Sequence, residues 1–318
     1  MPSNLTSRQS LESYGKGRFE LSLQTDGNLV LYSVSMPTSV RFKAYWASGT
    51  LHKNSTLVFD KTGHLSIKEG TTTIFNITQD NLWLTNEDFY YLYRIDNDGV
   101  FRQYNHPKKA GCNNLNWTIL QRIPQDICSA MSGDTGGGAC GYNSYCVTIN
   151  GEPDCLCPEG YSFLDPPNKN KGCKPDFPLP SCQATGWEAR HELVEFKELR
   201  DTDWPSSDYD LQIGNGVDKQ TCIQLCREDC FCAAAISDGN RTCWKKKYPL
   251  SSGGKSMGKI ALIKHNLQRN LERKGCSASQ ILPRQDCVSR LFEAFPEGEG
   301  QKDFVSSEIK MTAAVHYT

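Results

Sequence analysis

The clearest hydrophobic pattern in the chain is the alternation in LQTDGNLVLY, residues 23 to 32. The leucines occupy odd positions, whereas polar residues and one valine occupy the even positions. Strict alternation predicts β-strand, and Asp26-Gly27 in the middle predicts a tight hairpin turn. A hairpin keeps the parity of its two faces. We therefore expect the leucines to face a core and the even residues to form one outward face.

A weak internal repeat extends this pattern. Gly27, Gly63 and Gly99 each lie between two predicted strands, and they are evenly spaced because 63 − 27 = 36 and 99 − 63 = 36. The aligned segments read LQTDGNLVLY, FDKTGHLSIK and IDNDGVFRQY. Three similar units predict a closed all-β body in which they bury a shared core. The alternative is that three unrelated hairpins are spaced by coincidence.

The even residues of the first repeat form the pattern QxDxNxVxY, at Gln24, Asp26, Asn28, Val30 and Tyr32. This pattern resembles the mannose-binding motif of bulb-type (G-type) lectins, a family of β-prisms with three pseudo-repeats. The resemblance implies that the four polar side chains bind mannose hydroxyls while the valine packs against the sugar ring. Such a set suits a neutral sugar, whose hydroxyls both donate and accept hydrogen bonds.

The other two repeats depart from the motif. The third keeps only Asp98 and Tyr104, and the second has a different outward set: Asp60, Thr62, His64, Ser66 and Lys68. By comparison with the family, neither repeat is expected to bind sugar.

Cysteine usage changes abruptly along the chain. All 15 cysteines lie between Cys112 and Cys287, which predicts disulfide-built modules and an oxidising compartment. The odd count leaves at least one thiol unpaired or intermolecular. Five glycosylation sequons agree with this environment, at Asn4, Asn54, Asn76, Asn116 and Asn240.

Residues 112–173 contain the signature CLCPEGY, and six cysteines form the first set: Cys128, Cys140, Cys146, Cys155, Cys157 and Cys173. The segment resembles an EGF-like module, and the family pairing would be Cys128–Cys146, Cys140–Cys155 and Cys157–Cys173. Before the first cysteine, Gln125 and Asp126 do not form the acidic and amide pattern of calcium-binding modules, so we expect no calcium.

Residues 182–264 form a second cysteine-rich module. In DKQTCIQLCREDCFC, Cys222, Cys226 and Cys230 lie four residues apart, which predicts one face of a helix. Together with Cys232 and Cys243, the arrangement resembles a PAN/apple domain. Family pairing would be Cys222–Cys243 and Cys226–Cys232, and we expect Cys182–Cys230 as well. The alternative, a zinc site made of closely spaced thiols, has no nearby histidine to support it.

We therefore expect a mostly β, multidomain chain. It would comprise a bulb-type lectin β-prism at 1–111, an EGF-like module with linker at 112–180, an α+β PAN/apple domain at 181–264 and an irregular tail at 265–318. Cys276 and Cys287 in the tail, like Cys112, have no evident partner. This order resembles the extracellular half of plant S-domain (G-type lectin) receptor-like kinases. The sequence departs from them by lacking a leading lectin domain, a membrane span and the kinase, since no glycine-rich loop, H-R-D or D-F-G occurs.

Charge and hydropathy exclude other classes. The net charge of −1 and pI near 6.6 give no electrostatic footprint for nucleic acid or an anionic membrane. We expect Lys245-Lys246-Lys247, the only basic run, to be a solvated loop. No signal peptide is readable, and no run of about twenty apolar residues suggests a membrane span. Nothing in the sequence predicts a cofactor or a metal site.

Two fragments resemble catalytic motifs. GDTGGG at 133–138 resembles half of an aspartic-protease signature, but no second DTG supplies the partner carboxylate. HELVE at 191–195 has Glu195 where the zinc motif H-E-x-x-H needs its second histidine. Neither fragment predicts an enzyme.

The leading hypothesis is a non-catalytic, glycosylated recognition protein that binds mannose-type glycans and dimerises through its PAN module. A second hypothesis keeps the fold but makes the ligand a protein or lipid. A third is a non-functional fragment.

Overall fold

The computed structural model describes residues 4–79, 88–108, 116–179, 182, 194–239 and 241–266. Most of the tail expected at 265–318 lies outside these residues. So do the predicted glycosylation position Asn240 and three cysteines, Cys112, Cys276 and Cys287. The chain divides into two compact units, with the boundary between Gln125 and Asp126. Each unit is described by itself.

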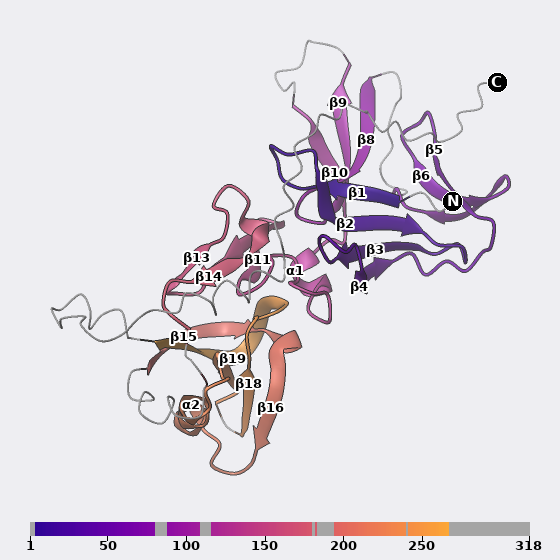
Figure 1. Cartoon of the computed structure of the whole chain (residues 1–318). Helices are drawn as coiled ribbons and strands as arrows, with labels where there is room; N and C mark the ends of the chain where they lie inside the picture. Colours follow the sequence, from indigo (N-terminus) through magenta and orange to yellow (C-terminus); the bar gives the residue numbers. More distant parts are fainter. Residues whose placement is uncertain are drawn as a thin grey trace. The chain divides into compact units, whose positions relative to one another are not determined.

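The first unit consists of three antiparallel sheets that follow one another along the chain (Figure 1). Their strand orders are β1-β2-β3-β4, β5-β6-β7 and β10-β9-β8. The strands are β1 (Asn4–Arg8), β2 (Lys16–Leu23), β3 (Leu29–Val34), β4 (Arg41–Ala47), β5 (Thr56–Phe59), β6 (Leu65–Glu69), β7 (Thr72–Asn76), β8 (Phe89–Ile95), β9 (Phe101–Pro107) and β10 (Thr118–Ile123).

One hairpin geometry occurs once in each sheet. Gly27, Gly63 and Gly99 have φ of 87°, 83° and 89°, a left-handed conformation that glycine adopts without a steric cost. In all three hairpins the glycine N–H donates to the carbonyl oxygen three residues earlier, at 3.0, 3.1 and 3.0 Å. The 36-residue spacing is therefore a structural repeat, not a coincidence of spacing.

The core of this unit lies between the three sheets. Leu29 and Leu31 of the first hairpin are buried in it, as the alternation predicts, at 1% and 0% exposed, whereas Leu23 is only partly buried. Side chains also link different sheets: the Tyr45 hydroxyl donates to the carbonyl of Gly99 at 2.7 Å. The buried apolar residues include Phe19, Leu21, Leu29, Leu31, Leu65, Ile67, Tyr93, Ile95 and Phe101.

The second unit is built around a seven-stranded sheet of order β12-β11-β19-β17-β18-β16, in which β15 also pairs with β19. Its strands are β11 (Tyr145–Ile149), β12 (Glu152–Leu156), β15 (Val194–Asp203), β16 (Asp208–Ile213), β17 (Ala234–Ser237), β18 (Thr242–Lys246) and β19 (Gly253–Asn266). A separate two-stranded sheet and short helices complete it: β13 (Tyr161–Phe163), β14 (Cys173–Pro175), α1 (Ile127–Ala130), η1 (Lys169–Lys171) and η3 (Pro205–Ser207).

The helix α2 (Lys219–Glu228) packs on one face of the large sheet (Figure 1). Asp218 caps its start, because the carboxylate accepts the Thr221 N–H at 2.8 Å. Cys222 and Cys226 point into the core, as predicted, but Cys230 lies beyond the helix. The placement of Cys230 on the helix face was wrong, because Asp229 takes an extended conformation that ends α2.

The EGF-like segment contributes β11 and β12 to the same sheet. Tyr145 and Tyr161 of this segment share one buried cluster with Trp204, Ile236 and other residues of the segment expected to be a PAN domain. The two segments also share backbone pairing, since β11 runs parallel to β19. The indole N–H of Trp204 further donates to the carbonyl of Ser144 at 2.7 Å. These contacts make the two segments one folded body.

Six disulfides cross-link this unit, and they are the pairs that the family resemblance implies together with the expected Cys182–Cys230. They are Cys128–Cys146, Cys140–Cys155, Cys157–Cys173, Cys182–Cys230, Cys222–Cys243 and Cys226–Cys232. None of these sulfurs is available as a zinc ligand.

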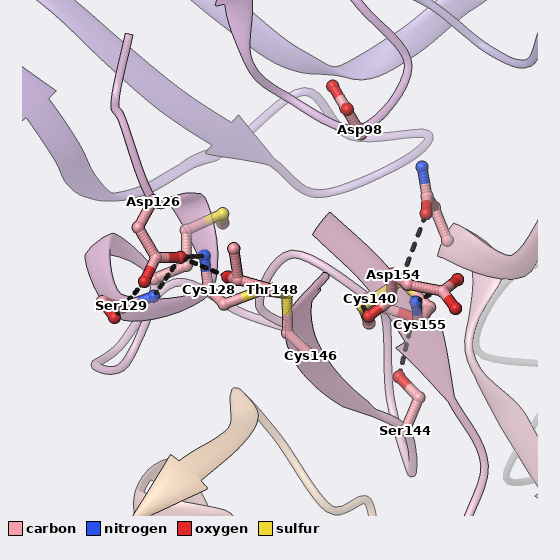
Figure 2. Close-up of a disulfide and its surroundings, with 12 residues drawn as sticks. Asp98, Asp126, Cys128, Ser129, Cys140, Ser144, Cys146, Thr148, Asp154 and Cys155 are labelled. Carbon is pink, nitrogen blue, oxygen red and sulfur yellow. Dashed lines mark hydrogen bonds between the residues drawn. A yellow bond between two sulfur atoms is a disulfide. The ribbon is translucent and has the colours of Figure 1, made fainter. Parts of the chain in front are cut away.

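Asp126 has a structural role beside the first of these disulfides. Its carboxylate accepts the N–H groups of Cys128 at 3.0 Å and Ser129 at 3.3 Å, and the Thr148 hydroxyl at 2.8 Å (Figure 2). Partial burial opposes ionisation, but hydrogen bonds from Ser129 and Thr148 outweigh it and lower the pKa of Asp126. The carboxylate is thus occupied as the cap of α1.

Two of the three lysines in the basic run do not lie in a solvated loop, and only Lys247 is exposed and outside a strand. Lys246 is 0% exposed, and its ammonium pairs with the carboxylates of Asp203 and Asp208. Lys245 bridges Asp210 and Asp229 at 2.8 and 2.7 Å. The expectation was wrong because both lysines belong to β18, whose neighbours supply carboxylates. A run of charges in the sequence does not show which residues oppose it across a sheet.

Candidate functional site

The five residues of the QxDxNxVxY pattern lie on the hairpin between β2 and β3. The turn at Asp26 and Gly27 joins the two strands, and Leu23 pairs with Leu29 at its base. The Gln24 N–H donates to the carbonyl of Asn28 at 2.8 Å, which closes the loop. Four of the five residues are partly exposed, and only Val30 is buried. The four are Gln24, Asp26, Asn28 and Tyr32. One short hairpin therefore brings the expected site residues together.

Each polar side chain of the set uses one atom to hold its own position. Asp26 Oδ1 accepts the Asn28 N–H at 3.0 Å, and Asn28 Oδ1 accepts the Ser48 hydroxyl at 3.1 Å and the Gly49 N–H at 3.0 Å. Gln24 Nε2 donates to the hydroxyl oxygen of Tyr32. These bonds fix the side chains before any ligand arrives.

The other polar atom of each side chain has no partner among the described residues. These atoms are an acceptor on Gln24 (Oε1), an acceptor on Asp26 (Oδ2), a donor on Asn28 (Nδ2) and the phenolic proton of Tyr32. Two acceptors and two donors on one preorganised hairpin match a ligand with several neighbouring hydroxyls.

Val30 differs from the expectation. Its side chain is only 2% exposed, between the cross-strand neighbours Ser22 and Ala47. The alternation places Val30 on the outward face but does not show how fully neighbouring strands cover it. Val30 can form the floor of a site, but it offers little surface to a sugar ring.

A charged pair beside the hairpin was not predicted from the sequence. Arg41 of β4 donates from Nε to Glu20 Oε1 of β2 at 2.9 Å, and from Nη2 to the Ser22 hydroxyl at 3.1 Å. Its guanidinium lies over the ring of Tyr32, 4.8 Å from the ring centroid. The alternation in FELSL, residues 19–23, could have placed Glu20 and Ser22 on the outward face. No sequence signal links them to Arg41.

The equivalent hairpin of the second repeat is occupied by its own contacts. Asp60 Oδ1 accepts the N–H of Thr62 at 2.9 Å and its hydroxyl at 2.6 Å, and it also accepts the His64 N–H at 3.1 Å. The imidazole of His64 shares a 2.8 Å hydrogen bond with Thr62. This arrangement differs from the open set of the first repeat.

The third repeat is closed by arginine. Arg102 stands where the first repeat has Val30, and it bridges Asp96 at 2.8 Å and Asp98 at 2.7 Å. The Tyr104 hydroxyl donates to Asp96 and accepts from Arg94. Burial, together with Asp96, raises the pKa of Tyr104 to about 12. Its polar groups are therefore bonded to one another and not available to a ligand.

The fragments that resemble catalytic motifs have ordinary positions. Thr135 of the GDTGGG segment is 3% exposed, and its hydroxyl donates to the carbonyl of Met131 at 3.1 Å. In HELVE, Val194 and Glu195 begin β15, while 191–193 lie outside the described residues. Within the described ranges, no group of three or more histidine, cysteine or carboxylate side chains is arranged to hold a metal ion.

Four of the expected glycosylation positions are described, and all are exposed: Asn4, Asn54, Asn76 and Asn116. Of the helices in the described residues, none is long and apolar enough to cross a membrane.

The chain is similar in sequence to part of several plant receptor kinases. It is 40% identical over 260 residues to the G-type lectin S-receptor-like serine/threonine-protein kinase LECRK3 of Oryza sativa subsp. indica. It is 33% identical over 269 residues to the kinase of the same description, RLK1, of Arabidopsis thaliana. These alignments cover 78% and 80% of this chain, but the chain spans only 31% of the length of either relative.

Two further comparisons are less informative. A monomeric monocot mannose-binding lectin from Gastrodia elata aligns with 39% of this chain and 94% of its own length. The sequence identity is 24% and the TM-score 0.26. No protein-family model matches the chain. The long alignments are therefore decisive: over about four fifths of its length, this chain is a homologue of the plant G-type lectin S-receptor-like serine/threonine-protein kinases.

Proposed function

We propose that this chain is a non-catalytic carbohydrate-recognition segment of a receptor-like kinase, which binds mannose-type glycans through the hairpin between β2 and β3. One observation carries the proposal. Gln24, Asp26, Asn28 and Tyr32 each keep one polar atom unpaired among the described residues, whereas the third repeat pairs the corresponding groups internally. The chain would act outside the cell or at its surface, in signal perception such as defence or self-recognition. Six disulfides support an oxidising compartment.

A single shallow site of this kind binds a monosaccharide weakly, with a dissociation constant on the order of 1 mM. Useful affinity then requires several sites acting together, through a branched glycan or through association of receptors. We include homo- or heterodimerisation through the PAN segment in the proposal for this reason.

The test is retention of the secreted chain on mannose-agarose, with elution by free mannose. The informative variant is Asp26→Asn/Asn28→Asp, because each new side chain retains the Oδ1 acceptor that holds the hairpin. Asp26→Asn removes the open carboxylate oxygen, and Asn28→Asp removes the open amide donor. We expect the parent to be retained and this variant to flow through.

The second repeat supplies a matched control. Thr62→Ala/His64→Ala changes the two corresponding positions of a hairpin with the same backbone, and it should be retained like the parent. If the folded parent flows through and also shows no binding of methyl α-mannoside in an NMR titration, mannose recognition by this hairpin is wrong.

The second candidate function is protein recognition by the PAN segment. A shallow hollow of about 320 Å³ lies against edge strand β16, lined by Tyr209, Leu211, Trp244 and two aspartates. Leu211 and Ile213 of this strand are 45% and 70% exposed. The double variant Leu211→Lys/Ile213→Lys and the variant Asp26→Asn distinguish the two functions. If the first abolishes the response to a ligand and the second leaves it intact, protein recognition by the PAN segment replaces mannose recognition as the proposed function.

A further inference from the structure

An arginine lies over the equivalent tyrosine in both the first and the third repeat. The Arg41 Cζ atom is 4.8 Å from the ring centroid of Tyr32, and the Arg94 Cζ atom is 4.9 Å from that of Tyr104. The arginines come from different strands, β4 and β8. In each repeat an arginine therefore lies over the equivalent tyrosine ring, although the arginine belongs to a different strand in each case.

The two phenols nevertheless differ. In the third repeat, Arg94 Nη2 donates to the Tyr104 hydroxyl at 3.3 Å, and the hydroxyl proton goes to Asp96. In the first repeat, the hydrogen bonds of Arg41 go to Glu20 and Ser22, and none goes to the Tyr32 hydroxyl. Only the first repeat leaves its phenolic proton without a partner among the described residues.

The residue opposite the tyrosine explains this difference. Glu20 is the cross-strand partner of Tyr32, and Leu92 is the cross-strand partner of Tyr104. Glu20 is 5% exposed, and a buried carboxylate is costly unless a cation pairs with it. Arg41 is thereby held at Glu20. Leu92 cannot hold Arg94, whose side chain turns to Asp96 and the phenol instead.

We propose that Glu20 is a positioning residue of the sugar site, which keeps Arg41 on the ring of Tyr32 and away from its hydroxyl. This inference rests on the proposed function. With Glu20 and Arg41 neutralising each other, Asp26 is the one remaining charge of the site described above, which suits a neutral ligand. An arginine released from Glu20 would compete for the phenol and for nearby carboxylates, as Arg94 and Arg102 do in the third repeat.

The test converts the first repeat into the third at this one position. Glu20→Leu copies Leu92 and releases Arg41, so we expect the affinity for methyl α-mannoside to fall at least tenfold, measured by NMR titration. The double variant Glu20→Leu/Arg41→Leu removes the released cation and should return to within about threefold of the parent. Replacement of a buried ion pair by apolar residues of similar volume is often neutral for stability, so the double variant should fold.

The rescue separates positioning from simple support of the fold. If Glu20→Leu binds like the parent, the inference is wrong. It is also wrong if the double variant melts like the parent in circular dichroism but stays tenfold weaker. Should Glu20→Leu alone fail to fold, a double variant that folds but stays tenfold weaker still overturns the inference.

A second readout does not need a sugar. The ¹³Cζ resonance of Tyr32 should shift in Glu20→Leu and return in the double variant, because it reports the hydrogen bonding of the phenol. If the parent binds no mannoside but this resonance shifts and returns, the proposed function fails while the positioning by Glu20 stands. A resonance that does not move contradicts the positioning.

Discussion

The first and third repeats of the lectin-like unit share a hairpin backbone and differ in what their side chains do with it. In both, a left-handed glycine closes the turn, and an aspartate accepts a backbone N–H at 3.0 Å. In the first repeat, the remaining polar atoms are unpaired among the described residues. In the third, Arg102 occupies the position of Val30 and binds both aspartates. One backbone can therefore carry an open recognition face or a closed ion-pair cluster.

The comparison teaches that an acidic residue in the motif is not evidence of binding by itself. Asp26 and Asp98 occupy equivalent positions and make the same bond to the backbone. They differ in the second carboxylate oxygen, which lacks a partner among the described residues in Asp26 and accepts from Arg102 at 2.7 Å in Asp98. Binding depends on which polar atoms still lack a hydrogen-bond partner once the contacts within the fold have formed.

The largest expected effect comes from removing the cation of the closed repeat. Arg102→Ala would remove the cation that the carboxylates of Asp96 and Asp98 share, and the arginine side chain is only 4% exposed. Breaking a buried ion pair typically costs about 3–5 kcal/mol of unfolding free energy. Urea denaturation of the chain measures the change.

A compensated variant is the control for that experiment. Arg102→Leu with Asp96→Asn and Asp98→Asn removes cation and anions together, so it should recover most of the lost stability. A loss below about 1 kcal/mol for Arg102→Ala would show that the third repeat is not held by this cluster.

A smaller and more specific effect is expected from the paired variants Asp26→Asn and Asp98→Asn. The first should reduce mannoside affinity at least tenfold and change unfolding free energy by less than about 0.5 kcal/mol. The second should leave affinity unchanged and lower unfolding free energy by about 1.5–3 kcal/mol, because it weakens hydrogen bonds to a charged partner. NMR titration and urea denaturation of both variants test this crossed pattern, and equal effects of the two changes would contradict it.

The sequence alone predicts the hairpin and the repeat on which this comparison of the two repeats rests. Alternation places the motif residues on one hairpin, and the even spacing of three glycines predicts the threefold repeat. The same reasoning predicts a solvated loop at Lys245–Lys247, but Lys245 and Lys246 lie within β18 and pair with carboxylates of neighbouring segments. Periodicity describes one strand at a time and does not show the residues that oppose it.

The features that the sequence did not predict are mainly contacts between segments that lie far apart in the chain. Glu20 and Arg41 lie on strands separated by β3, and β11 pairs with β19 through Tyr145 and Gly253. No local pattern connects such residues. The disulfide pairs were expected from family resemblance, because six cysteines alone allow fifteen connectivities. Burial of Val30 is likewise a property of the assembled sheet.

The smallest expected effect concerns the phenol of the closed repeat at alkaline pH. Burial and Asp96 raise the pKa of Tyr104 to about 12, above the ordinary value of 10.0. The folded chain therefore binds this proton more tightly than the unfolded chain does. The resulting stability is present in full below pH 10 and is lost as the pH rises through the folded-state pKa.

Tyr104→Phe removes this ionisation and isolates it from that of the other tyrosines. Between pH 10 and 12, the melting temperature of the parent should fall more steeply than that of Tyr104→Phe, measured by circular dichroism. The phenolate absorbance of the parent should also gain a late component near pH 12 that the variant lacks. Parallel melting curves would mean that the Tyr104 phenol is not held by Asp96, and the contrast with the open phenol of Tyr32 would then lose its physical basis.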